Sequence, residues 1–91
     1  MYKITKYSKT QAKKLGVEIR PSANKTKKID VYKNNKKIAS IGAIGYMDYP
    51  SFMEKNGIQY AKSRRKLYKI RHEKDRKVKG TAGYYADKIL W

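Results

Sequence analysis

The sequence predicts an α+β fold in which a small three-stranded antiparallel sheet packs on one long helix, with two or three short helices. Two observations predict this class. Residues 28–41 alternate apolar and polar side chains around Asn34-Asn35, which is typical of a β-hairpin. Residues 58–77 contain neither Gly nor Pro, which favours a helix longer than any other in the chain. A chain of 91 residues has the length of one small domain.

The first 16 residues form a basic N-terminal segment, and we expect a short helix within it. Ser8 begins a capping box, and Gly16 stands where a left-handed C-terminal residue is expected. These two signals predict a helix over residues 9–15. Residues 17–20 then alternate and precede a proline, which indicates a short strand.

The hairpin has a register that follows from its turn. Asn tolerates positive φ, so residues 34–35 fit a two-residue type I′ turn. This turn length pairs Val31 with Ile38 and places Ile29 on the same face. Ile41 then falls on the opposite face.

Residues 17–42 are therefore expected to form the sheet, and residues 50–91 the helical part of one domain that spans the whole chain. Ser51 begins a second capping box and should start a short helix. Thr81 should cap a last short helix over residues 82–90.

The composition argues against most kinds of catalysis. The chain has no Cys and a single histidine, His72, so it lacks the ligands of a typical metal site, and we expect no cofactor. No Ser–His–acid set is identifiable, and the glycines do not follow a phosphate-loop pattern. The N-terminus has no apolar leader and no run is long enough to span a bilayer, so we expect a protein that is neither secreted nor membrane-spanning. We expect a protein that is not an enzyme.

The charge indicates a polyanionic partner. The chain carries 24 Lys or Arg against 7 Asp or Glu, which gives a net charge of +17. Such a balance is the electrostatic signature of a nucleic-acid binder. Lys far outnumbers Arg, which favours contacts with backbone phosphates over readout of base edges. An A/T-rich genome would produce the same excess of Lys, so this alternative stays open.

A helical projection of residues 58–77 separates a basic stripe from a broad apolar face, which holds Tyr60, Ala61, Leu67, Tyr68 and Ile70. We expect this stripe to track phosphates, assisted by two lysines at the hairpin tip, although a solvated helix face is the alternative. The predicted nucleic-acid contacts are Lys62, Arg65, Lys66, Lys69 and Arg76 on the helix, and Lys36 and Lys37 at the tip.

Two arginines fall inside the apolar sector of the same projection. Arg64 and Arg71 must be paired there or must reach out of it. One interpretation is structural: Arg71 pairs with Asp75 at i+4, and both arginines bind loop carbonyls. The other interpretation is an anion site formed by the two arginines and a Tyr hydroxyl. Among the nine Tyr residues, the best candidates for exposed contacts are Tyr2, Tyr7, Tyr32 and Tyr46.

Three segments taken together, residues 41–50, 60–72 and 80–91, resemble small basic proteins encoded by large double-stranded DNA viruses of algae and protists. The similarity covers residues 28–91. That group has no assigned activity, so the resemblance implies no site residue. It implies a viral product that acts in or around the virion, or in the host cytoplasm or nucleus during infection.

Three functions are compatible with these observations. The first is a protein that binds nucleic acid, DNA rather than RNA, through backbone phosphates. The second is a minor capsid or cement protein that contacts acidic capsid surfaces. The third is an RNA binder of the ribosomal type, which has a similar size and charge. The sequence leaves the oligomeric state open.

Overall fold

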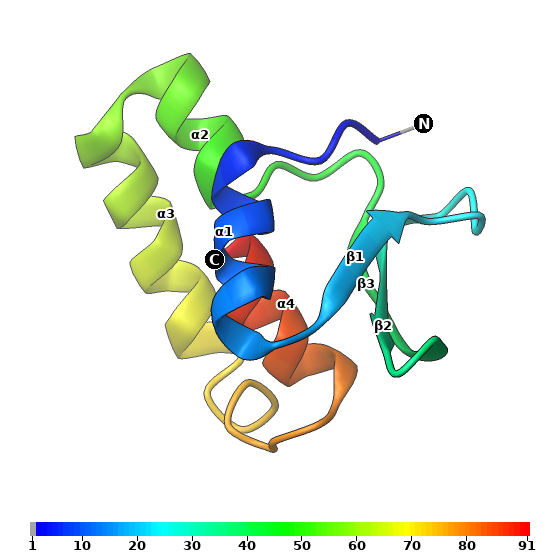
Figure 1. Cartoon of the computed structure of the whole chain (residues 1–91). Coiled ribbons are helices and arrows are strands. Elements are labelled where there is room, and N and C mark those ends of the chain that lie inside the picture. The colour runs from blue at the N-terminus through cyan, green and yellow to red at the C-terminus, as the bar shows by residue number, and fades with distance from the viewer. Residues whose placement is uncertain (1) are drawn as a thin grey trace.

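The computed structural model describes residues 2–91 and confirms the α+β class. The three strands form one antiparallel sheet in the order β1-β2-β3. Figure 1 shows the sheet on one side of the molecule, α1 and α4 beside it, and α2 and α3 on the far side of those helices. The elements in chain order are α1 (Lys6–Leu15), β1 (Glu18–Pro21), β2 (Lys27–Lys33), β3 (Lys36–Ala43), α2 (Tyr49–Asn56), α3 (Ile58–Arg71) and α4 (Ala82–Leu90).

The helix that covers the sheet is α4, with α1 beside it, and this corrects the prediction that the long helix does so. The core joins Ile29, Val31 and Ile41 from the sheet to Ile89 and Leu90 from α4, and all five are at most 1 % exposed. The helix α4 can seal the sheet because its inward face is apolar. The longest helix, α3, is too rich in Lys and Arg to do the same.

The longest helix also ends earlier than predicted, at Arg71 rather than near residue 77. Residues 72–80 form turns that carry the chain back to α4. No Gly or Pro stops the helix. Instead, Arg76 Nε donates to the Lys69 carbonyl (3.3 Å), which supplies a partner to a helix-end carbonyl. This contact therefore accompanies the end of α3, and the sequence pattern alone gives no signal for it.

The predicted hairpin turn is confirmed, but its register is not. Asn34 and Asn35 have φ of 53° and 64°, as a type I′ turn requires. A β-bulge opposite Val31 then shifts the pairing by one residue, so Val31 faces Ala39 and Ile29 faces Ile41. Because side chains alternate between faces, this shift brings Ile41 into the core. Ile38, the predicted partner of Val31, is 36 % exposed.

Two of the predicted helix caps lie elsewhere. The first helix begins at Lys6, with Thr5 rather than Ser8 as the N-cap. Ser8 is buried and donates its hydroxyl to the Ile89 carbonyl (2.9 Å), which ties α1 to α4. The cap of α2 is Asp48, whose Oδ1 accepts from the Ser51 amide (3.0 Å). In both helices the residue that caps the N-terminus therefore stands three residues before the predicted serine.

The other two helix-end signals are confirmed. Gly16 ends α1 in the left-handed conformation, with φ of 72°. Thr81 caps α4 by accepting from the Tyr84 amide (3.3 Å). No helix within residues 2–91 is long and apolar enough to cross a membrane.

Candidate nucleic-acid interface and an adjoining cleft

The predicted basic stripe of α3 is divided between the surface and the interior. Lys62 and Lys66 are exposed, as the prediction requires. Arg65, Lys69 and Arg76 are only partly exposed, because their charged groups point toward α4 and the C-terminus. The helix is therefore rotated relative to the predicted projection.

Arg65 fastens α3 to the end of the chain. Its Nε donates to the Trp91 carbonyl at 2.8 Å, and its Nη2 lies 3.4 Å from the Tyr7 hydroxyl. Its guanidinium also stacks over the Tyr49 ring, 3.7 Å from the ring centroid. These contacts occupy both its hydrogen-bonding edge and its face.

Lys69 and Arg76 hold a buried carboxylate. Asp87 on α4 has a side chain that is 1 % exposed, and Lys69 Nζ bonds directly to its Oδ1. Arg76 Nη1 and Lys88 Nζ each lie 3.9 Å from its Oδ2. A buried carboxylate requires such partners, because desolvation of an unpaired charge is costly. This acid explains why α3 turns part of its basic stripe inward.

The predicted apolar face of α3 is likewise divided between the surface and the interior. Tyr60, Leu67 and Ile70 are 47 %, 49 % and 63 % exposed, whereas Ala61 and Tyr68 are buried. The predicted inward face is therefore confirmed for Ala61 and Tyr68 and wrong for the other three residues. The inward side of α3 instead carries Arg65 and Lys69, which bond to the Trp91 carbonyl and to Asp87.

The lysines predicted at the hairpin tip are exposed. Lys36 and Lys37 directly follow the turn, and Lys37 Nζ lies 4.0 Å from Asp30 Oδ2. Asp30 is buried, which by itself raises its pKa. Hydrogen bonds from Ser22 and Ser40, with the charge of Lys37, outweigh this effect and hold the pKa below its usual value.

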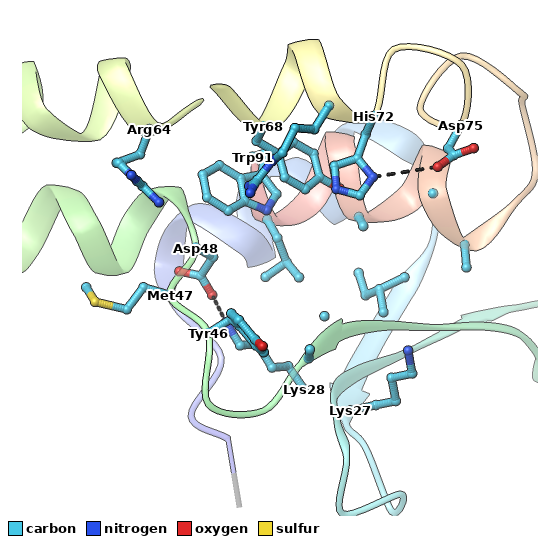
Figure 2. A pocket seen from close by; sticks show the side chains of 18 of the residues that line it. Lys27, Lys28, Tyr46, Met47, Asp48, Arg64, Tyr68, His72, Asp75 and Trp91 are labelled. Atoms are coloured by element: carbon cyan, nitrogen blue, oxygen red, sulfur yellow. Dashed lines mark hydrogen bonds and ion pairs between the residues drawn. The ribbon is translucent and has the colours of Figure 1, made fainter. Parts of the chain in front are cut away.

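Arg64 and Arg71 line one cleft of about 750 Å³, which lies between α3 and α4 on one side and β3 with the following loop on the other. Figure 2 shows this cleft from close by. The predicted pair of Arg71 with Asp75 is not formed. The chain has left the helix by residue 75, and Asp75 instead lies 3.6 Å from His72 Nδ1. The carbonyl contacts expected of these two arginines are made by Arg65 and Arg76.

Stacked aromatic rings form the helical wall of the cleft. Tyr68 stands between His72 and Trp91, with centroid separations of 4.3 and 4.4 Å. Burial, together with the nearby charges of Asp87 and Asp75, raises the pKa of Tyr68 to about 12. The Tyr68 hydroxyl is therefore protonated at neutral pH.

The opposite wall approaches closely because Gly42 has no side chain. Gly42 has φ of +77°, and a Cβ there would lie 2.8 Å from Leu90 Cδ1. Lys27 and Tyr46 also line this side, and Tyr46 is 75 % exposed.

A buried ion pair fixes the loop that forms this wall. Lys28 Nζ lies 3.1 Å from Asp48 Oδ2, which also accepts from the Tyr2 hydroxyl (2.7 Å). Burial alone raises the pKa of Asp48. Hydrogen bonds from Ser51 and Tyr2, with the charge of Lys28, outweigh it and lower the pKa below its ordinary value. The same contact with Asp48, added to burial, raises the pKa of Tyr2.

Sequence reasoning missed most of the cleft. Asp48 carried a usable signal, since an Asp two residues before Pro50 is typical of a helix start. Lys27 and Lys28 carried no comparable signal, because they look like two more surface lysines. Within residues 2–91, no three His, Cys, Asp or Glu side chains are grouped so that they could hold a metal ion.

Comparison with known proteins gives one partial match. The model of a family of unknown function (DUF5754) matches residues 17–51. That segment holds the whole sheet, the loop after it and the start of α2, and it includes Lys28 and Asp48. No curated protein and no solved structure matches the chain.

Proposed function

We propose that this protein is a non-enzymatic module that binds nucleic acid, DNA rather than RNA, through the backbone phosphates. The observation that carries the proposal is the pairing of the acidic side chains with cations of the protein itself. Nearly all of them already serve internal partners: Asp48 pairs with Lys28, Asp87 with Lys69, and Glu73 with Arg76 and Lys77.

Eight surface lysines have no internal counter-charge in the described part of the chain. No carboxylate within residues 2–91 lies within 4.0 Å of the charged groups of Lys6, Lys9, Lys13, Lys14, Lys62, Lys66, Lys74 and Lys79. Those on α1 and α3 belong to the helical side of the molecule in Figure 1. Mutual repulsion among them favours an external polyanion. Lysine suits this role because a mobile point charge tolerates many phosphate positions.

The predicted contact set is refined accordingly. Lys62, Lys66, Lys36 and Lys37 remain candidate phosphate contacts, since they are exposed. Because Arg65, Lys69 and Arg76 are engaged inside the protein, they contribute to binding mainly by holding α3 in place.

A salt titration of variants tests this proposal. Lys62→Gln/Lys66→Gln should reduce the slope of log affinity against log salt for duplex DNA by about 0.9 for each phosphate that the protein no longer neutralises. Lys55→Gln is the control for one lost charge, because Lys55 is an exposed lysine on α2 that follows an acidic neighbour, Glu54. Equal slopes in the double variant and the control would overturn the assignment of α3 to the interface.

A second candidate function, a minor capsid or cement protein, is favoured by the exposed apolar row of α3. Tyr60, Leu67 and Ile70 lie on the outer side of the helix beside uncompensated lysines, so an acidic protein surface with apolar residues would fit them. In this case Leu67→Gln/Ile70→Gln should abolish co-sedimentation with assembled capsid shells and leave DNA affinity unchanged. The viral setting itself is proposed from the resemblance of residues 28–91.

A further inference from the structure

We propose that the cleft between α3 and the loop after β3 holds one unstacked nucleotide of a single strand, with the base on the exposed ring of Tyr46 and the phosphate at Arg64 and Arg71. This inference rests on the proposed function and adds to it a preference for single strands. A duplex has no free base face to offer, so the exposed lysines alone would bind it.

The aromatic lining is the first observation. Tyr46 is 75 % exposed, although Asp48 in the same loop forms a buried ion pair with Lys28 on β2. Figure 2 shows Tyr46 on one side of the cleft, with Trp91 and Tyr68 on the other. An exposed Tyr ring contributes little to stability through burial, whereas it is well suited to stack on a base.

The second observation is the charge of the cleft. Arg64, Arg71 and Lys27 line it, and no carboxylate in the described part of the chain lies within 4.0 Å of their charged groups. Of its two acids, Asp48 is paired with Lys28, and the three cations outnumber the other, Asp75, which lies 3.6 Å from His72 Nδ1. The guanidinium of Arg64 lies over the Phe52 ring, 5.5 Å from the centroid, which orients the group and leaves its N–H edge available.

The third observation is size. A volume of about 750 Å³ falls within the usual range for small-molecule sites, which is roughly 300–1,000 Å³. It therefore accommodates a base together with its sugar and phosphate. Because Gly42 has no side chain, its backbone packs closely against Leu90 where β3 lines the cleft.

The sole tryptophan of the chain makes the test direct. Trp91 lines the cleft, so its fluorescence reports on a base that enters. The probes are single-stranded oligothymidylate, a duplex of equal length and heparin. We expect oligothymidylate to quench Trp91 emission, and heparin at equal occupancy to leave it unchanged.

Substitutions then locate the base. Tyr46→Ala should weaken oligothymidylate binding about 10-fold and leave duplex affinity unchanged, in line with the removal of one stacking partner. Tyr32→Ala is the control, because Tyr32 packs under Arg20 on the sheet, away from the cleft. Arg71→Gln should weaken oligothymidylate binding more than Lys74→Gln, which removes an equal charge just beyond the cleft.

The outcomes separate the two proposals. If oligothymidylate binds but Tyr46→Ala behaves like Tyr32→Ala, or Trp91 emission does not change, the nucleotide site is overturned and phosphate binding by the lysines stands. If neither the strand nor the duplex binds at physiological salt, both proposals fail. Circular dichroism of each variant confirms that the fold is retained, as expected for a residue as exposed as Tyr46.

Discussion

Replacement of Lys69 tests whether a cation in the predicted basic stripe serves the fold or the ligand. In Lys69→Met, the Asp87 carboxylate loses its one direct bond to Lys69 and stays buried in the protein. A hydrogen bond to a charged group contributes about 1.5–3 kcal/mol, and isolation of a buried carboxylate costs about 3–5 kcal/mol. Arg76 and Lys88 remain 3.9 Å from Asp87 Oδ2, and the Lys69 side chain is 28 % exposed. We therefore expect the smaller cost, about 2 kcal/mol.

The matched control is Lys62→Met on the same helix, which removes the same charge from an exposed position. It should change stability by less than about 0.5 kcal/mol. Thermal unfolding measures the difference: Lys69→Met should lower Tm by about 8–16 °C, because 1 kcal/mol corresponds to roughly 4–8 °C in a domain of this size. DNA binding should show the reverse pattern, with the smaller salt slope in Lys62→Met. Equal Tm values for the two variants would refute the structural role of Lys69.

Three further predictions concern the walls of the cleft. Asp48→Asn should lower the free energy of unfolding by about 3 kcal/mol, because it leaves Lys28 buried without its carboxylate. Since the folded pKa of Asp48 is lowered, the wild type should lose this stability as the pH falls below about 4. Urea titrations at pH 7 and pH 3 should therefore show a smaller change of stability with pH in the variant than in the wild type. Gly42→Ala should cost about 1–3 kcal/mol, because the new Cβ would meet Leu90 at 2.8 Å with φ at +77°; an unchanged urea midpoint would contradict this. Tyr68 has a raised folded pKa of about 12, so the free energy of unfolding should fall as the pH rises from about 10 toward 12, and Tyr68→Phe should show a smaller fall.

Local signals in the sequence predicted local features well. Positive φ at Asn34 and Asn35 and the left-handed end of α1 at Gly16 follow from the conformational freedom of those residues, whatever packs against them. Thr81 likewise needs only its own helix to act as a cap. The number of strands and their antiparallel pairing followed because a hairpin and a preceding short strand leave few alternatives.

The orientation of α3 could not be predicted in the same way. A helical projection assumes that Lys and Arg face water, but Asp87 and the Trp91 carbonyl draw Lys69 and Arg65 inward. Both partners come from the last five residues of the chain, so only the tertiary fold brings them to α3. The β-bulge could not be predicted locally either, because it brings Ile41 into the core that the sheet shares with α4.

The cleft, too, was predictable from the sequence only in part. The projection identified Arg64 and Arg71 as a possible anion site, and the structure places both in one cleft. The aromatic half of that cleft joins Tyr46 from a loop to Trp91 at the chain end, and no spacing in the sequence relates them.

The most direct test of nucleic-acid binding is the affinity of the unmodified protein for duplex DNA across a salt series, with heparin as a matched polyanion. We expect six to ten phosphate contacts, which would weaken binding by roughly 10³–10⁵ between 50 and 200 mM salt. The proposal predicts that binding remains measurable near physiological salt and exceeds binding to heparin. Binding that vanishes there, or that is equal on heparin, would contradict it.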